Sequence, residues 1–269
     1  MRHFLTITLT ACLIAANVGC TAVSITGRKQ LNIVPDSMMN AMSFQSYRQF
    51  LSENKLSANA SQTQMVKTVG NRIKQAVQQY DAKYGLEADL SRYQWEFNLV
   101  EGAQVNAWAM PGGKVVVYTG LMPIARDQAG LATVIGHEIA HAIAKHGSER
   151  MTQGLLFEMG GMALSKAVET RPAKTQQLFM KSYNIGTTYG VMLPYSRTHE
   201  KEADHLGLIF MAMAGYDPHT AIDFWHRMAA LKDAANRPPE LLSTHPASGT
   251  RIENIENLIP QAMQYYKPR

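Results

Sequence analysis

The sequence is poor in cysteine: its 269 residues contain two, Cys12 and Cys20, both close to the start. The remainder of the chain therefore has no thiol for a disulfide bond or for a cysteine-ligated zinc site. Its stability must come from a packed apolar core, and a chain of this length is long enough to build one as a single domain. Any metal site in it must use histidine and carboxylate ligands.

Long apolar runs and clustered charges are also scarce. The mostly apolar segment from Phe4 to Val18 is shorter than the roughly 20 residues that a membrane-spanning helix needs. Basic residues exceed acidic ones, giving a net charge of +5, but they are scattered, and Arg28-Lys29 is the only adjacent basic pair. Without a basic stripe interleaved with aromatic residues, nucleic acid is not expected as a partner.

The first residues have the character of an export signal. A basic start precedes the apolar segment, and small residues at 18–19 precede Cys20. The position of Cys20 resembles the lipobox of bacterial lipoproteins, in which the cysteine is acylated, although Asn17 stands where that motif usually has leucine. We therefore predict a signal peptide at 1–19, a lipid-attached tether at 20–35 and a single domain at 36–269. The predicted location is the periplasmic face of the outer membrane, and a soluble periplasmic or secreted protein is the alternative.

The most informative local pattern is His-Glu-Ile-Ala-His at residues 137–141. His137 and His141 lie one turn apart on the same face of a helix, so that both can bind one metal ion. Glu138 then lies beside the ion without binding it, where it can act as a general base. The predicted helix, 127–150, is apolar on most sides, and burying unliganded histidine and glutamate in it would be costly. Two histidines satisfied by solvent or by the core are the alternative.

A catalytic zinc ion normally takes three protein ligands. Glu200 and Asp204 are the best candidates for the third, because they share one face of a predicted helix that begins near Ser196. One of them can bind the metal while the other orients a ligating imidazole. Glu202 is predicted to point elsewhere. The same acids would also suit a solvated helix start, which the helix dipole favours.

The rest of the pattern predicts a mainly helical α+β fold. Apolar residues recur at helical spacing over 36–53 and 61–84, and residues 93–100 alternate as a strand does. Strands are also predicted at 104–110 and 114–118, joined by a turn at Pro111-Gly112-Gly113. The sheet is therefore small and precedes the metal-site helix.

Four motifs in one order resemble a known family. The His-Glu-Ile-Ala-His motif, Ser-Arg-x-x-Glu-x-x-Ala-Asp at 196–204, the strand motif at 106–113, and Ser-Thr-His-Pro at 243–246 with Arg251 are similar to the CaaX-protease/HtpX family of zinc metallopeptidases, the minigluzincins. Within that family the chain most resembles periplasmic LoiP/BepA-like lipoproteins without the repeat domain. The resemblance implies a minigluzincin-type zinc peptidase domain with a small β-sheet beside the active-site helix.

The resemblance assigns roles to the metal-site residues. It implies one Zn²⁺ per chain, held by His137, His141 and Glu200. It makes Glu138 the general base that takes a proton from water and passes it to the leaving amine. Asp204 is the residue expected to orient a metal-binding histidine.

Further roles follow from the other two motifs. The resemblance implies that His245 can close over the zinc as a fourth ligand and hold the enzyme inactive, although a capping residue is an equal alternative. Asn106 and Ala107 lie on a predicted edge strand where an extended peptide could pair. Asn106 would equally suit a strand end.

These observations predict an exported zinc-dependent endopeptidase. Its expected substrates are polypeptides, in particular unfolded or misassembled envelope proteins, and a lipid on Cys20 is expected to attach it to the membrane. The alternative is a lipoprotein chaperone or assembly factor that uses the peptide groove with little turnover. The presence of Glu138 favours catalysis, and the absence of other cysteines argues against a structural zinc site.

Overall fold

A computed structural model describes residues 20–86, 88–158, 166, 169–183, 196–234, 239–245 and 249–268. The predicted signal peptide, residues 1–19, lies outside the described residues. In chain order the helices and strands are β1 (Cys20–Ala22), β2 (Lys29–Leu31), α2 (Asp36–Glu53), α3 (Ala60–Tyr84), β3 (Glu96–Val100), β4 (Ala107–Met110), β5 (Lys114–Tyr118), α4 (Met122–Ala125), α5 (Gln128–Ile143), α6 (His146–Glu158), α8 (Pro172–Ser182), α9 (Arg197–Met213), α10 (Thr220–Ala234), α11 (Glu240–Thr244) and α12 (Gly249–Ala262). None of the described helices has the length and apolar character needed to cross a membrane.

The predicted fold class, mainly helical α+β with a small sheet, is confirmed. The sheet has three strands in the order β3-β5-β4, with β5 parallel to β3 and antiparallel to β4. The predicted turn joins β4 to β5, and Gly112 and Gly113 adopt φ values of 76° and 83°, which favour glycine. β4 is therefore an edge strand of this sheet.

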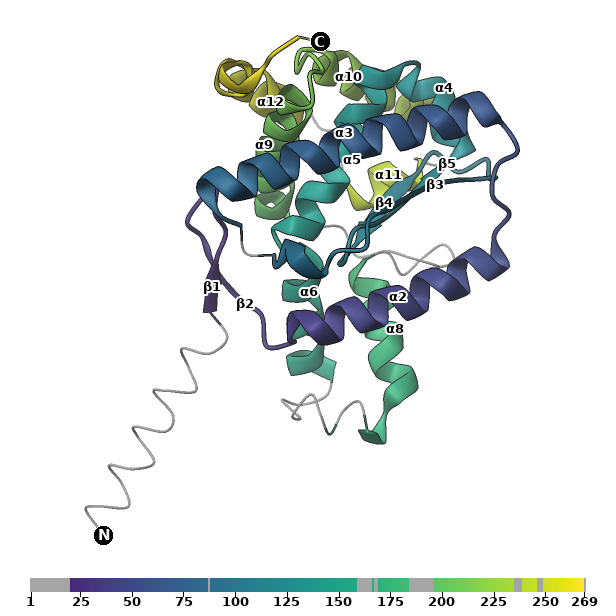
Figure 1. The fold of residues 1–269 in the computed structure, drawn as a ribbon, viewed down its shortest axis with the longest axis vertical. Coiled ribbons are helices and arrows are strands. Elements are labelled where there is room, and N and C mark those ends of the chain that lie inside the picture. The colour runs from purple at the N-terminus through teal and green to yellow at the C-terminus, as the bar shows by residue number, and fades with distance from the viewer. Residues whose placement is uncertain are drawn as a thin grey trace, which may run out of the picture.

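Helices cover both faces of the sheet. Residues that alternate along the strands, such as Val115 and Val117, join the main core with α3 and α5. Residues that point to the other face, such as Val116 of β5 and Trp108 of β4, pack towards α2 in a second core. There the rings of Phe50 and Trp108 meet edge to face, with centroids 4.9 Å apart. Figure 1 shows α3 and α2 on opposite sides of the strands. This double burial explains why every residue of β5 is buried.

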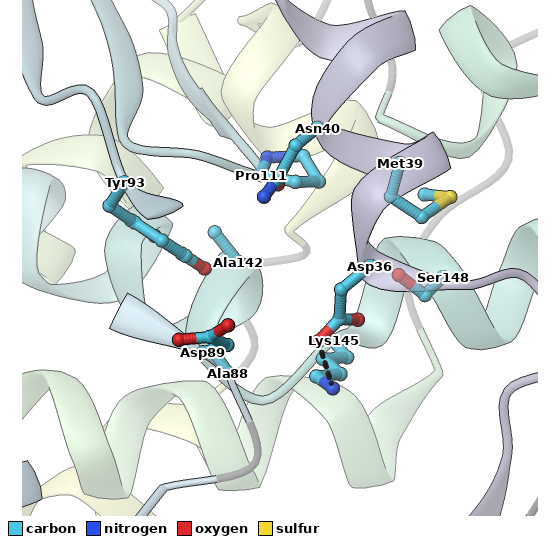
Figure 2. A pocket seen from close by; sticks show the side chains of 10 residues that line it. All are labelled: Asp36, Met39, Asn40, Ala88, Asp89, Tyr93, Pro111, Ala142, Lys145 and Ser148. Carbon is cyan, nitrogen blue, oxygen red and sulfur yellow. Dashed lines mark hydrogen bonds and ion pairs between the residues drawn. The ribbon is translucent and has the colours of Figure 1, made fainter. Parts of the chain in front are cut away.

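The predicted helix at 127–150 is in fact two helices. α5 ends at Ile143 and α6 begins at His146, and the helix is interrupted between them because Lys145 adopts a left-handed conformation with φ of 56°. The Lys145 ammonium group donates to Asp36 Oδ2 at 2.8 Å, at the start of α2. Figure 2 shows this ion pair at the rim of a small cavity of about 10 Å³. The apolar pattern continues across the break, so periodicity alone gave no sign of it.

Residues 20–35 form a hairpin rather than a loose extended segment. β1 and β2 pair antiparallel, and Val23, in the turn between them, is fully buried in the main core. The Gln30 side chain donates to the carbonyl of Ala144 at 3.0 Å, at the end of α5. Gly27, with φ of 67°, allows the chain to reverse. The hairpin is therefore packed on the domain, and the lipid on Cys20 stays a prediction.

Candidate metal centre

Three helices bring the predicted site residues together. α5 carries His137, Glu138 and His141 on adjacent turns. α9 begins at Arg197 because the side chain of Ser196 accepts a hydrogen bond from the backbone N–H of His199 and caps the helix. That start places Glu200 in the first turn and Asp204 one turn further on, both facing α5. α11 ends at His245. All of these predicted site residues are buried.

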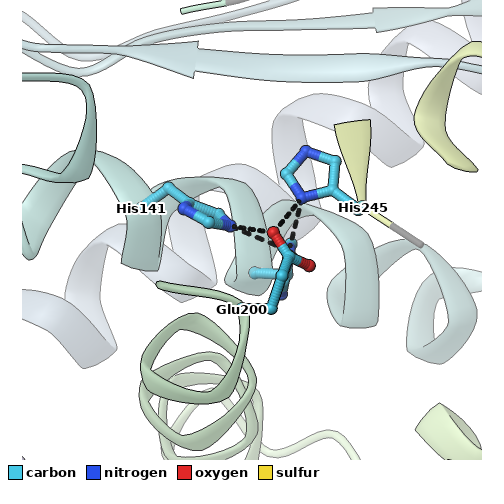
Figure 3. A group of neighbouring side chains, drawn as sticks. His141, Glu200 and His245 are labelled. Carbon is cyan, nitrogen blue, oxygen red and sulfur yellow. Dashed lines mark hydrogen bonds and ion pairs between the residues drawn. The ribbon is translucent and has the colours of Figure 1, made fainter. Parts of the chain in front are cut away.

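Four of these side chains converge on one point. His137, His141, Glu200 and His245 each offer one ligand atom, and these atoms all lie within 4.8 Å of one another. His137 Nε2 is 3.1 Å from both His141 Nε2 and His245 Nδ1. Glu200 Oε1 is 2.8 Å from His245 Nδ1 and 3.3 Å from His141 Nε2. Figure 3 shows the Glu200 carboxylate facing the rings of His141 and His245.

The spacing of these atoms suits a divalent metal ion. Ligand atoms about 2.0–2.1 Å from a tetrahedral zinc ion lie about 3.3 Å from each other. The four distances given above run from 2.8 to 3.3 Å, and all of the ligand atoms lie within 4.8 Å of one another. The His137 Nδ1 atom is 2.9 Å from Asp204 Oδ1, which assigns the ring proton to Nδ1 and leaves the Nε2 lone pair facing the cluster. Three imidazole nitrogens and a carboxylate oxygen around one point fit such an ion.

Arg251 holds the surroundings of this cluster in place. Its guanidinium group donates to Asp204 Oδ1 at 2.7 Å and Oδ2 at 2.9 Å. The same group lies 2.9 Å from Glu200 Oε2 and donates to the His245 carbonyl at 3.2 Å. It also stacks on Trp225, 3.6 Å from the ring centroid. The buried positive charge therefore compensates two carboxylates and holds the backbone that carries His245.

The two glutamates at the site differ in their protonation behaviour. Burial raises the pKa of Glu138 above its ordinary value, and the nearby positive groups reduce this effect without cancelling it. For Glu200 burial also favours the neutral form, but the charges of His245 and Arg251 outweigh it and hold the pKa well below its usual range. Glu200 is thus a carboxylate suited to bind a cation, whereas Glu138 is suited to accept a proton.

The predicted substrate-binding residues lie at the start of β4. Asn106 Oδ1 accepts a hydrogen bond from the N–H of Ala107 at 2.9 Å, and the Asn106 carbonyl accepts from the N–H of Tyr118 at 3.1 Å. Asn106 therefore accepts hydrogen bonds at the beginning of the strand in this structure, and a role of Asn106 and Ala107 in substrate binding stays a prediction.

Several residues around the site were not found from the sequence. Glu202, predicted to point away from the metal-binding residues, does so, yet it is only 1% exposed. It accepts hydrogen bonds from Arg28 and contacts His146, which in turn contacts His141. The sequence did contain one signal for this contact: His146 is a third histidine in the same segment, five residues after His141.

The fold and the site together are those of a metallopeptidase: a buried helix with the His-Glu-x-x-His pattern faces a carboxylate from a neighbouring helix. The sequence matches Peptidase family M48 over residues 67–259, and the chain belongs to that family. The prediction of a zinc metallopeptidase of the minigluzincin type is confirmed at this level.

Curated relatives agree with this assignment. The chain is 34% identical over 176 residues to the mitochondrial metalloendopeptidase OMA1 of Schizosaccharomyces pombe, covering 64% of this chain and 49% of the relative. Identity to the protein of the same name in Saccharomyces cerevisiae is 34% over 184 residues, covering 66% and 51%. The beta-barrel assembly-enhancing protease of Yersinia pestis is 27% identical over 198 residues, covering 72% and 38%. The chain thus spans about half the length of these two OMA1 proteins.

The comparisons correct the predicted location. The periplasmic face of the outer membrane was predicted from the basic start, the apolar segment and Cys20, but this prediction is wrong: the OMA1 relatives from yeasts, cattle and humans are named as mitochondrial proteins. The physical reason is that a short apolar segment after a basic start cannot distinguish one targeting route from another.

Proposed function

We propose that this chain is a zinc-dependent endopeptidase that hydrolyses peptide bonds in unfolded polypeptides, as an enzyme of protein quality control. One observation carries the proposal: His137, His141 and Glu200 converge from two helices together with His245, and the carboxyl group of Glu138 lies 3.4 Å from Nε2 of His245. That combination provides a metal site and a proton acceptor in one buried position.

Each side chain has a role in this chemistry. His137 and His141 hold the metal through Nε2, and Glu200 holds it through its carboxylate. When bound, zinc polarises the substrate carbonyl and makes a water molecule more acidic. Glu138 takes the proton from that water and passes it to the leaving amine, and burial raises its pKa in the direction that such transfer needs. Asp204 orients His137 through Nδ1.

The edge of the sheet supports binding of an extended peptide. Because Tyr118 N–H donates to the carbonyl of Asn106, the alternation of an antiparallel ladder turns the backbone groups of Ala107 and Ala109 away from β5. The carbonyls of both residues and the N–H of Ala109 then face the side on which a substrate strand could add. Only a chain in extended conformation can pair in this way, which favours unfolded substrates.

His245 supports a latent state of the same site. It directly follows α11. Its Nδ1 lies among the metal-binding atoms, and its Nε2 is 3.4 Å from Glu138 Oε1. An imidazole in this place occupies the position that water and substrate need. We propose that His245 holds the enzyme inactive as a fourth ligand, until substrate shifts the population towards an open state.

The test of the proposed function is cleavage of an unfolded protein such as casein. The metal-loaded protein should cleave it, a chelator should abolish cleavage, and one equivalent of zinc should restore it. Suppression of aggregation without any cleavage would instead favour the alternative function, a chaperone or assembly factor.

We further propose that a lipid on Cys20 attaches the protein to a membrane. Cys20 is the first residue of β1, and only Gly19 separates it from the apolar segment that ends at Val18, so that an acyl chain there would hold the domain close to the bilayer. Labelled fatty acid should be incorporated into the wild type but not into Cys20→Ala, which should move to the soluble fraction. Absence of label from the wild type would remove the anchor from the account.

A further inference from the structure

The second ring nitrogen of His141 has an unusual partner. His141 Nε2 faces the metal cluster, and its Nδ1 lies 2.9 Å from Nδ1 of His146. On one continuous helix two residues five apart would point about 140° away from each other. The break at Lys145 between α5 and α6 is what allows the His146 ring to return to His141.

The contacts of His146 continue away from the metal. His146 Nε2 lies 3.0 Å from Oε2 of Glu202, which is on α9. If His141 binds metal through Nε2, its proton is on Nδ1 and is donated to His146 Nδ1, so that the His146 proton is on Nε2 and is donated to Glu202. The three groups therefore form a directed hydrogen-bonded series that ends on a carboxylate.

His137, the other proposed metal-binding histidine, is hydrogen-bonded to a carboxylate without an intervening ring. His137 Nδ1 meets the carboxylate of Asp204 directly, at 2.9 Å, and Arg251 compensates that carboxylate. For His141 the carboxylate acts through an intervening imidazole, and the compensating cation is Arg28. Both metal-binding rings are thus oriented by a buried carboxylate with an arginine behind it.

Arg28 comes from the N-terminal hairpin, far from the site in the sequence. Its guanidinium group donates to Glu202 through Nε at 3.0 Å and to Glu149 through Nη2 at 2.8 Å. Glu149 in turn pairs with His199, whose ring stacks on that of His146 at 4.4 Å. One arginine thereby bridges Glu149 on α6 and Glu202 on α9.

Two further hydrogen bonds of the hairpin lie beside Arg28. The Thr26 hydroxyl donates to Glu202 Oε1 at 2.6 Å, beside the Arg28 contact. The turn is closed by the N–H of Val23, which donates to the Arg28 carbonyl at 2.8 Å. The exposed neighbour Lys29 points away.

We propose that Arg28 is a positioning residue of the metal site, through which the N-terminal hairpin controls metal retention. Arg28 fixes the carboxylate of Glu202. That carboxylate orients the ring of His146, and His146 in turn orients the ring of His141. The inference rests on the proposed function in that it takes the His137, His141 and Glu200 cluster as the metal site. In consequence, displacement of the hairpin from Glu202 loosens the metal without touching a ligand.

The test is a zinc titration of the full-length metal-free protein against a competing chelator of known affinity. Arg28→Met should weaken zinc binding about 10- to 100-fold, as loss of a partner that orients a ligand does. Lys29→Met, which alters the adjacent exposed residue of the hairpin, is the matched control and should bind as the wild type does. Arg28→Lys should fall between the wild type and Arg28→Met, because one ammonium group cannot bridge two carboxylates as the guanidinium fork does.

A second set of variants tests the route. His146→Leu should weaken zinc binding at least as much as Arg28→Met, and His146→Asn should recover part of the loss, because its amide oxygen can accept from His141 Nδ1. The double variant Arg28→Met/His146→Leu should bind no more weakly than His146→Leu alone. If the losses of zinc affinity in the two single variants add fully in the double variant, Arg28 does not act through His146 and the proposed route is overturned. If folded Arg28→Met binds zinc as tightly as the wild type, the role of Arg28 is overturned. Failure of the wild type itself to bind zinc would instead overturn the proposed function.

Discussion

Gly136 and Gly207 face each other where α5 crosses α9. A Cβ atom on Gly136 would lie 2.9 Å from the carbonyl oxygen of Gly207, and one on Gly207 would lie 2.9 Å from the backbone nitrogen of His137. The two helices are therefore in backbone contact next to His137, the first of the proposed metal ligands. This contact sets the distance across which His137 and Glu200 meet.

A methyl group at this crossing should disturb both stability and the site. We expect Gly136→Ala to lower the free energy of unfolding by about 1–3 kcal/mol, because the helix backbones must move apart, and to weaken zinc binding. Thermal unfolding with and without zinc measures both effects. Gly249→Ala is the control, because among the described residues a Cβ there meets no atom within 4 Å. A Gly136→Ala variant as stable as the wild type would contradict the close crossing.

Glu200 and Asp204 should separate into a ligand and an orienting residue. Glu200→Ala should lose most of its zinc, because one of three ligands is removed. Asp204→Ala should weaken zinc binding or activity by about 10- to 100-fold, because His137 loses the carboxylate that orients it. Metal analysis after dialysis distinguishes the two. Full zinc content in Glu200→Ala would remove Glu200 from the site.

His245→Ala should increase activity. Without the imidazole the open position becomes accessible, so we expect more casein cleavage or self-cleavage while zinc content stays near one per chain. A rate no higher than that of the wild type would contradict a latching role for His245.

Glu149 should contribute to stability in a pH-dependent way. Burial favours its neutral form, but hydrogen bonds from His199 and Arg28 outweigh this and hold the pKa at about 2. Because the pKa is lower in the folded state than the usual value near 4.3, the stabilisation is present above about pH 4.3 and is lost as the pH falls towards 2.

Urea unfolding of the metal-free protein tests this dependence. The difference in unfolding free energy between wild type and Glu149→Gln should be largest near neutral pH and shrink across that acidic window. Glu256→Gln, which alters an exposed carboxylate on α12, is the control. A difference that does not change with pH would show that Glu149 stabilises the fold by packing alone.

The parts of the site that were predicted are those encoded by short spacings. His137 and His141 lie one helical turn apart, as do Glu200 and Asp204, and such spacing specifies a shared face wherever the helix packs. The three strands were predicted because alternating residues and a Pro-Gly-Gly turn are also local signals. The resemblance to a family then joined these separate segments into one site.

The parts that were not predicted depend on contacts between distant segments. Arg28 lies 121 residues from Glu149 and 174 from Glu202, and no local pattern connects them. The break at Lys145 leaves the apolar periodicity intact, so the sequence showed a third histidine at position 146 but not that its ring returns to His141. The burial of His245 depends likewise on Arg251, which holds its backbone from the following helix.

The most direct test of the central claim compares wild type with Glu138→Gln. Both proteins should bind one zinc ion and unfold at similar temperatures, because Glu138 is not a ligand in this account. The variant should nevertheless lose peptidase activity by several orders of magnitude, since an amide cannot take the proton from water. Zinc-loaded, folded Glu138→Gln that cleaves casein at the wild-type rate would contradict the account.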